Sequence, residues 1–258
     1  MKSISLNVVF VLILAFAPSA VRGEEIRVAA ASDLSFVLQE IGARFQKETG
    51  HTVKFSFGSS GNFFAQIQNG APFDLFFSAD LGYPRELEAA GLAEPGTFYR
   101  YATGQIVLWV PAGSRLDVSK GLSVLLDPGV HTIAIANPRH APYGRAAVAA
   151  LQHEKLYEKL QGKLVLGENI SQTAQFVESG SADAGILALS LVAAPAMKGR
   201  GRYFEIPQGD YPPIEQAAVI LRSSKHKQTA RQFLEYLKKP ESVALLQHYG
   251  FALPGGGR

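Results

Sequence analysis

The chain has 258 residues, 47% of them hydrophobic and 18% charged, so it is long enough for one large or two small domains and is not of the disordered class. The formal charge is +3, and loss of Lys2 and Arg22 with an N-terminal leader would leave 23 basic against 22 acidic residues, which gives no indication of nucleic-acid binding. The absence of cysteine excludes disulfides, thiolate metal sites and a cysteine-linked lipid anchor.

The first residues have the pattern of an export signal. Lys2 precedes the unbroken apolar run Val8–Ala17, and small residues surround Ala20 and Gly23. This run is too short to cross a bilayer, and no later run is long enough. We therefore expect residues 1–23 to be a signal peptide that is cleaved near residue 23. The mature chain would then have about 235 residues and be free in the periplasm, with no stable membrane insertion.

The first two units of the mature chain are each predicted to be a strand, a short turn and a helix. Residues 26–31 form an apolar run that ends at Ser32-Asp33, and apolar residues at helical spacing follow at once. Residues 53–57 run into Gly-Ser-Ser-Gly at 58–61, and a second helix follows. In each unit a serine hydroxyl lies beside unpaired N–H groups at the positive end of a helix, where an oxyanion can bind without a cationic side chain. On neighbouring parallel strands both turns would face one crevice.

The rest of the chain repeats this alternation in two series, which predicts an α/β protein with two lobes and a cleft between them. Each lobe is expected to be a mostly parallel sheet flanked by helices, with residues 24–104 plus 215–258 in lobe I and 105–214 in lobe II. A Pro-rich stretch near 207–214 would return the chain to lobe I. The further strands are expected over 74–78, 104–111 (after a lead-in at 99–103), 131–136, 163–166, 183–189 and 217–221, and the further helices over 83–90, 121–126, 142–154, about 170–179, 227–238 and 241–249.

Four predicted helix starts, two from each half, carry small or neutral donor groups. Taken singly, each has an ordinary structural interpretation: Ser32-Asp33 as a helix cap, Tyr143 as an aromatic packed within its own lobe, and Ile170 as a residue that offers only its N–H. Asn169 or Ser171 can cap the helix that carries Ile170. Their joint occurrence is what indicates a shared anion site.

Catalytic motifs are incomplete, so we predict a binding protein and not an enzyme. Asn62 stands where a G-x-S-x-G elbow requires glycine, and Tyr157 stands where a zinc helix beginning at His153 requires its second histidine. An exported serine hydrolase that uses Ser60 with His140 is a less favoured alternative, because no orienting acid is evident.

Five segments together resemble the periplasmic molybdate-binding proteins of ABC transporters. The resemblance extends from about residue 26 to residue 251 and implies a two-lobed type II periplasmic binding fold. It also implies that the protein captures molybdate, and tungstate, for a membrane permease, acting as a monomer without a cofactor. The segments are AAASDL at 29–34, SFGSSGNFFAQI at 56–67, GAPFDLFFSAD at 70–80, NPRHAPYGRAA at 137–147 and HYGF at 248–251.

The resemblance also implies the site, with the oxyanion held between the lobes by neutral hydrogen bonds. Molybdenum would be present only as the centre of this oxyanion, with no residue bound to the metal itself. Where some members have a tyrosine after a late strand, this chain has Ala188, so Tyr143 would take over as the aromatic donor. The groups implied are Ser32 and Ser60 in the first lobe, and Tyr143 and the backbone N–H of Ile170 in the second. To these we add, as a hypothesis, the N–H of Asp33.

Asp33 conflicts with this picture, because a carboxylate beside a bound dianion repels it at short range in a low-dielectric site. We expect its side chain to turn away to a cap or surface partner. The rival hypothesis is that it accepts a proton from a protonated oxyanion such as hydrogen phosphate, which would overturn molybdate as the ligand. A receptor for another tetrahedral oxyanion, sulfate or phosphate, is the first alternative function. Trp109, the only tryptophan, is expected near the lobe junction.

Overall fold

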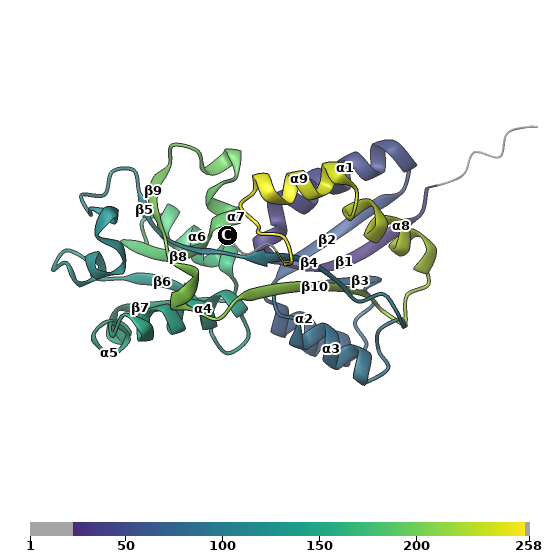
Figure 1. Cartoon of the computed structure of the whole chain (residues 1–258), viewed down its shortest axis with the longest axis horizontal. Helices are drawn as coiled ribbons and strands as arrows, with labels where there is room; N and C mark the ends of the chain where they lie inside the picture. Colours follow the sequence, from purple (N-terminus) through teal and green to yellow (C-terminus); the bar gives the residue numbers. More distant parts are fainter. Residues whose placement is uncertain (1–22, 256–258) are drawn as a thin grey trace, which may run out of the picture.

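Two five-stranded sheets form the two lobes of the molecule, one at each end of its long axis (Figure 1). The computed structural model describes residues 23–255, so nearly all of the expected signal peptide lies outside the described residues. The first sheet has the order β2 (Thr52–Gly58), β1 (Glu25–Ala31), β3 (Leu75–Ser78), β10 (Ile214–Ile220), β4 (Tyr99–Gly104). The second has the order β7 (Leu164–Gly167), β6 (Ile133–Ala136), β8 (Ala184–Ala188), β5 (Ile106–Pro111), β9 (Gly201–Glu205).

Both sheets are mixed, with one strand running against the direction of the others in each. In the first sheet β1 pairs in parallel with β2 and β3, while β10 is antiparallel to β3 and β4. In the second, β6 pairs in parallel with β7 and β8, while β5 is antiparallel to β8 and β9. The strands that run against the others, β10 and β5, are the ones that enter their sheets from the other lobe. A parallel strand must be reached through a crossover connection, usually a helix, and an antiparallel strand does not need one. The other four strands of each sheet share one direction.

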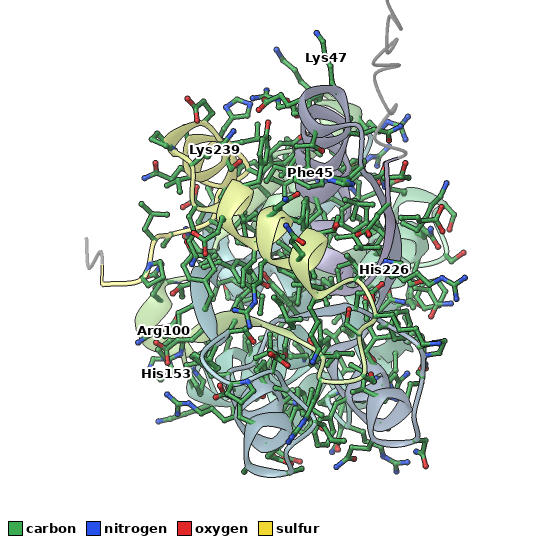
Figure 2. The ribbon with its side chains drawn as sticks, turned by 90° about the vertical axis from the view of Figure 1, so that its right-hand side faces the viewer. Phe45, Lys47, Arg100, His153, His226 and Lys239 are labelled. Carbon is green, nitrogen blue, oxygen red and sulfur yellow. The ribbon has the colours of Figure 1, made fainter. Side chains whose placement is uncertain are left out.

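Helices cover both faces of the first sheet (Figure 1). The apolar face of helix α1 (Ser35–Thr49) lies against the two C-terminal helices. There the Phe45 ring packs edge-on against Phe233 and Tyr236 at centroid distances of 5.2 and 5.4 Å. Figure 2 shows Phe45 within this packing, while Lys47 of the same helix points outward, as amphipathic spacing requires. One face carries α1 (Ser35–Thr49), α8 (Lys227–Leu237) and α9 (Pro240–His248), and the other carries α2 (Ser60–Gln68) and α3 (Gly82–Ala89).

The second lobe contains elements that the sequence did not predict. Strand β9 lies where the sequence predicted no element, because it is an edge strand whose residues are mostly exposed and so has no apolar run. Residues 118–126 form 3-10 turns and not the expected short α-helix. The helices of this lobe are α4 (Pro142–His153), α5 (Tyr157–Leu160), α6 (Ile170–Glu178) and α7 (Leu189–Val192), of which α5 and α7 were not predicted.

The chain passes between the sheets twice, directly from β4 into β5 at Gln105 and from β9 to β10 through residues 206–213. Trp109 does not lie at this junction. It is a buried residue within β5, paired with Gly185 on one side and Tyr203 on the other. None of the helices in the described part of the chain is long and apolar enough to span a membrane.

Candidate functional site

The two serine turns lie side by side, as the sequence predicted. Strands β1 and β2 are adjacent and parallel, and Ala31 pairs with Gly58 at their carboxyl ends. Ser60 is the first residue of α2. Ser32 begins a 3-10 turn, η1 (Ser32–Leu34), that comes before α1, so the first helix starts one turn later than expected. Both serines are almost completely buried.

The second lobe contributes two helix starts that face these turns. Tyr143 lies in the first turn of α4, directly after Pro142. Ile170 begins α6, whose cap is Asn169: its side-chain oxygen accepts hydrogen bonds from the N–H groups of Ser171 and Gln172, both at 3.0 Å. Of the two caps considered from the sequence, the structure therefore selects Asn169, because its short amide side chain reaches both unpaired N–H groups.

These four helix starts enclose a small cavity between the lobes. Its volume in this arrangement is about 10 Å³, room for about one water molecule, so a sugar or a peptide is excluded and even a small ion requires the walls to part slightly. Lysine and arginine are absent from its lining within residues 23–255, so an anion there would depend on hydroxyls, N–H groups and helix dipoles. All five residues implied from sequence line it: the full lining is Ala31, Ser32, Asp33, Gly58, Ser59, Ser60, Ala79, Ala141, Pro142, Tyr143 and Ile170.

Ser32 joins the two lobes directly. Its hydroxyl donates to the Asn169 side-chain oxygen at 3.2 Å and accepts from the Ser171 N–H at 3.3 Å. The Ser171 hydroxyl in turn donates to the Ser32 carbonyl at 3.0 Å. The structure therefore has the lobes closed on one another at the start of α6.

Ser60 has its hydroxyl hydrogen available. Its Oγ accepts from the N–H of Ala79 at 3.0 Å, which fixes the side chain, and this is its only hydrogen bond within residues 23–255. A hydroxyl that already accepts one bond can still donate one. Ser60 is thus set to donate into the cavity.

Asp33 is buried, with 1% of its surface exposed, and takes part in a network that links both lobes. Its Oδ2 accepts from the Tyr143 hydroxyl at 2.9 Å and from the Gln216 amide at 2.7 Å. The Gln216 amide also lies 3.1 Å from the Tyr143 oxygen, and the Tyr101 hydroxyl donates to the other end of Gln216 at 2.8 Å. The expectation that Asp33 turns to a surface partner is therefore wrong, because β10 places a buried amide within its reach.

The burial of this network changes its ionisation. Removal from water raises the pKa of the Asp33 carboxyl to about 6, although Gln216, Tyr143 and nearby backbone N–H groups favour its charged form. Burial and the neighbouring Asp33 raise the pKa of Tyr143 well above its usual range, so its hydroxyl keeps its hydrogen. That single hydrogen is already donated to Asp33, and the sequence-based role of Tyr143 as a donor to the ion is not met in this arrangement.

Sequence reasoning missed two residues that hold this network together. Gln216 is a fully buried polar residue in the middle of β10, and that polarity inside an otherwise apolar strand was a usable signal. At Gly104 an added Cβ would lie 2.1 Å from the Tyr143 oxygen and 2.8 Å from the Gln216 nitrogen, so only glycine leaves room for them. No local pattern marks this position, because its neighbours come from distant segments.

A second set of contacts closes the cavity rim. His140 Nδ1 lies 2.9 Å from the Ser59 hydroxyl, and the Gly61 N–H donates to the His140 carbonyl at 2.9 Å. The Asn62 amide donates to Glu168 across the cleft. The Ser60–His140 pair on which the hydrolase alternative depends is not formed, since His140 contacts Ser59 instead and the Ser60 oxygen accepts from a backbone N–H.

Comparison with known proteins identifies the family of the chain. Residues 26–252 match the family of bacterial extracellular solute-binding proteins. The chain belongs to this family. It is 40% identical to the molybdate-binding protein ModA of Rhodobacter capsulatus over 93% of this chain and 92% of the relative, and 39% identical to ModA of Azotobacter vinelandii over 91% and 92%.

Solved structures support the fold of this solute-binding protein. The periplasmic molybdate-binding protein of Azotobacter vinelandii, 40% identical, superposes with a TM-score of 0.84 over 89% of this chain and 99% of that one. The sulfate-binding protein SubI of Mycobacterium tuberculosis, 18% identical, gives 0.70 over 90% and 88%, and its likeness concerns the fold alone. The family resemblance and the two-lobed α/β fold predicted from sequence are confirmed.

Proposed function

We propose that this solute-binding protein captures molybdate, and tungstate, in the periplasm and delivers it to the membrane permease of an ABC importer. It would do so as a monomer, without a cofactor and without catalysing a reaction. The observation that carries the proposal is the small cavity between the lobes, bordered by helix starts of both and by no lysine or arginine of the described residues, in a chain 40% identical to molybdate-binding proteins.

In this proposal, hydrogen bonds from both lobes hold the four oxygens of the ion, and no residue contacts the metal. Ser60 donates its available hydroxyl hydrogen, while Asp33 and Ile170 donate backbone N–H groups. Ser32 turns its hydroxyl from Asn169 to the ion, a change of small cost because Asn169 keeps its two backbone donors. Tyr143 borders the ion and would donate to it once its hydrogen bond to Asp33 opens.

Closure is the step that selects the ion. We propose that lobe I, residues 24–104 plus 215–258, and lobe II, residues 105–214, move about the two crossings. An ion that contacts both lobes stabilises the closed arrangement over the open one, because only the closed arrangement offers all the donors at once. The contacts between Ser32 and Ser171 and between Asn62 and Glu168 close the rim around it.

Calorimetric titration of the mature protein with molybdate, tungstate, sulfate and phosphate tests the proposal. Fluorescence is the poorer probe, because Trp109 lies inside the second sheet, away from the cavity lining. We expect tight binding of molybdate and tungstate and much weaker binding of the other two. Binding of sulfate or phosphate in preference to molybdate would make the protein a receptor for that ion instead.

Variants then locate the site. Ser60→Ala removes one donor from a buried site and should weaken molybdate binding by about tenfold or more. Ser123→Ala is the control, because this exposed hydroxyl bonds only to a nearby carbonyl in its own turn. Equal affinities for the two variants would place the ion elsewhere.

A further inference from the structure

One oxygen of the cavity carboxylate has no partner. Within residues 23–255, Asp33 Oδ1 is the only buried side-chain nitrogen or oxygen without a hydrogen bond. The other oxygen, Oδ2, already accepts from Tyr143 and Gln216. A buried unpaired acceptor is costly, and here it belongs to a residue that lines the cavity. Oδ1 is therefore the atom whose partner is still to be supplied.

A dianion cannot supply that partner if Asp33 is ionised. The oxygens of molybdate and of a carboxylate both only accept hydrogen bonds, and their charges repel each other at short range. The cavity lining holds no cationic side chain that would compensate within the described residues. One additional hydrogen between Oδ1 and the ion removes both difficulties at once.

We propose that the protein binds its oxyanion together with one proton, which Asp33 holds on Oδ1 and donates to an oxygen of the ion. The proposal rests on the proposed function and concerns the same cavity. The proton comes from water or buffer and forms the O–H bond on Oδ1, so the carboxyl becomes neutral and the complex carries the charge of the ion alone. Asp33 then contributes a side-chain donor in addition to its N–H.

Burial favours this protonation over the opposing effect of the hydrogen bonds to Asp33, and no cationic side chain of the described residues takes part in the network. Tyr143 on α4 and, one hydrogen bond further, Tyr101 on β4 are the titratable groups of the network, and both keep their hydrogens because their pKa values are raised well above the usual range. Gln216 on β10 is neutral, and Ser190 on α7 donates to the Asp33 carbonyl at 2.8 Å. Burial has already raised the pKa of Asp33 to about 6, and a dianion placed beside it raises that pKa further.

Proton uptake on binding is the direct consequence. At pH 8 Asp33 of the free protein is ionised and molybdate carries no proton, so each bound ion takes up about one proton. At pH 5 Asp33 is already protonated and uptake falls close to zero. The affinity for molybdate should accordingly fall by about tenfold for each pH unit above the pKa of free Asp33.

Calorimetry of the mature protein measures this uptake. Molybdate is titrated at pH 8 and at pH 5 in buffers of different ionisation enthalpy, and the slope of the observed heat against that enthalpy gives the number of protons. A slope near one at pH 8 and near zero at pH 5 is expected. Molybdate binding with no uptake at pH 8 overturns this inference and leaves the proposed function intact, whereas failure to bind molybdate at all overturns the function.

Two further measurements locate the proton. Asp33→Asn keeps the shape of the side chain and offers an N–H in place of Oδ1–H, so its binding should take up no proton and lose its pH dependence; uptake that persists in this variant overturns the inference. Asp127→Asn, which changes an exposed turn carboxylate, is the control that should behave as wild type.

Hydrogen phosphate brings its own proton, so any binding of it at pH 8 should show proton uptake near zero. Uptake of one proton would contradict the shared-proton geometry. If Asp33→Asn does not fold, the proton uptake that calorimetry gives for the wild-type protein at pH 8 and pH 5 still tests the inference.

Discussion

Replacing Asp33 by asparagine should stabilise the unliganded protein at neutral pH. The folded state raises the pKa of this carboxyl from 3.8 to about 6, so between these values the folded protein binds more protons than the unfolded chain. Its stability therefore falls as pH rises from about 4 to 6, and stays lower above that. Each pKa unit corresponds to about 1.36 kcal/mol, so the penalty approaches an upper limit of about 3 kcal/mol. The amide keeps the acceptor for Tyr143 and Gln216 without this penalty.

The test compares wild type and Asp33→Asn by denaturant unfolding without ligand at pH 4 and pH 7.5. The unfolding free energy of the variant minus that of wild type should increase by up to about 3 kcal/mol from pH 4 to pH 7.5. For a chain of this size this corresponds to roughly 6–12 °C in Tm. Comparing the difference at two pH values removes the effects of other titrating groups and of the amide itself. Asp127→Asn serves as the matched control for an exposed carboxylate. An equal difference at both pH values would refute the assignment of a raised pKa to Asp33.

Three other substitutions probe the surroundings of the cavity. Gly104→Ala should destabilise the protein by about 1–3 kcal/mol and weaken molybdate binding, because its Cβ would collide with the Tyr143 oxygen. Gly113→Ala is the control: open space surrounds this position, so unfolding by denaturant and titration with molybdate should both match wild type. Asn169→Ala removes the cap of α6 and should cost about 1 kcal/mol of unfolding free energy, with weaker binding by calorimetry. Asn62→Ala removes a contact across the cleft and should speed release of the ion by roughly 2- to 10-fold in stopped-flow displacement, with little change in unfolding free energy.

The parts of the site that could be predicted from sequence depend on local patterns. An apolar run followed by Ser32 or by the Gly-Ser-Ser-Gly turn marks the end of a strand and the start of a helix, and both places were found. The same holds for Pro142 at the start of α4 and for the strand–helix units of the second lobe. Local spacing is sufficient here because a strand end and a helix start are each determined by a few consecutive residues.

The parts that could not be predicted depend on contacts between distant segments. Gln216 lies 183 positions from Asp33 in the chain, and Tyr143 lies 110 positions from it, so no window of sequence contains the network. The direction of the Asp33 side chain follows from where β10 enters the first sheet, and that strand comes antiparallel from the other lobe. Charge repulsion alone suggested an outward side chain. In the structure the Asp33 side chain is instead buried, accepts hydrogen bonds from Tyr143 and Gln216, and has a raised pKa.

The proton on Asp33 also bears on how the site distinguishes one tetrahedral dianion from another. Cavity size is one basis, and it is set by main-chain elements at the ends of β1 and β2 and the starts of α4 and α6. Basicity is a second. A neutral carboxylic acid donates a stronger hydrogen bond to a more basic oxygen, and the oxygens of molybdate and tungstate are more basic than those of sulfate, the anion of a strong acid. A donor on Oδ1 therefore favours molybdate and tungstate over sulfate, whereas backbone N–H groups respond much less to the difference in basicity.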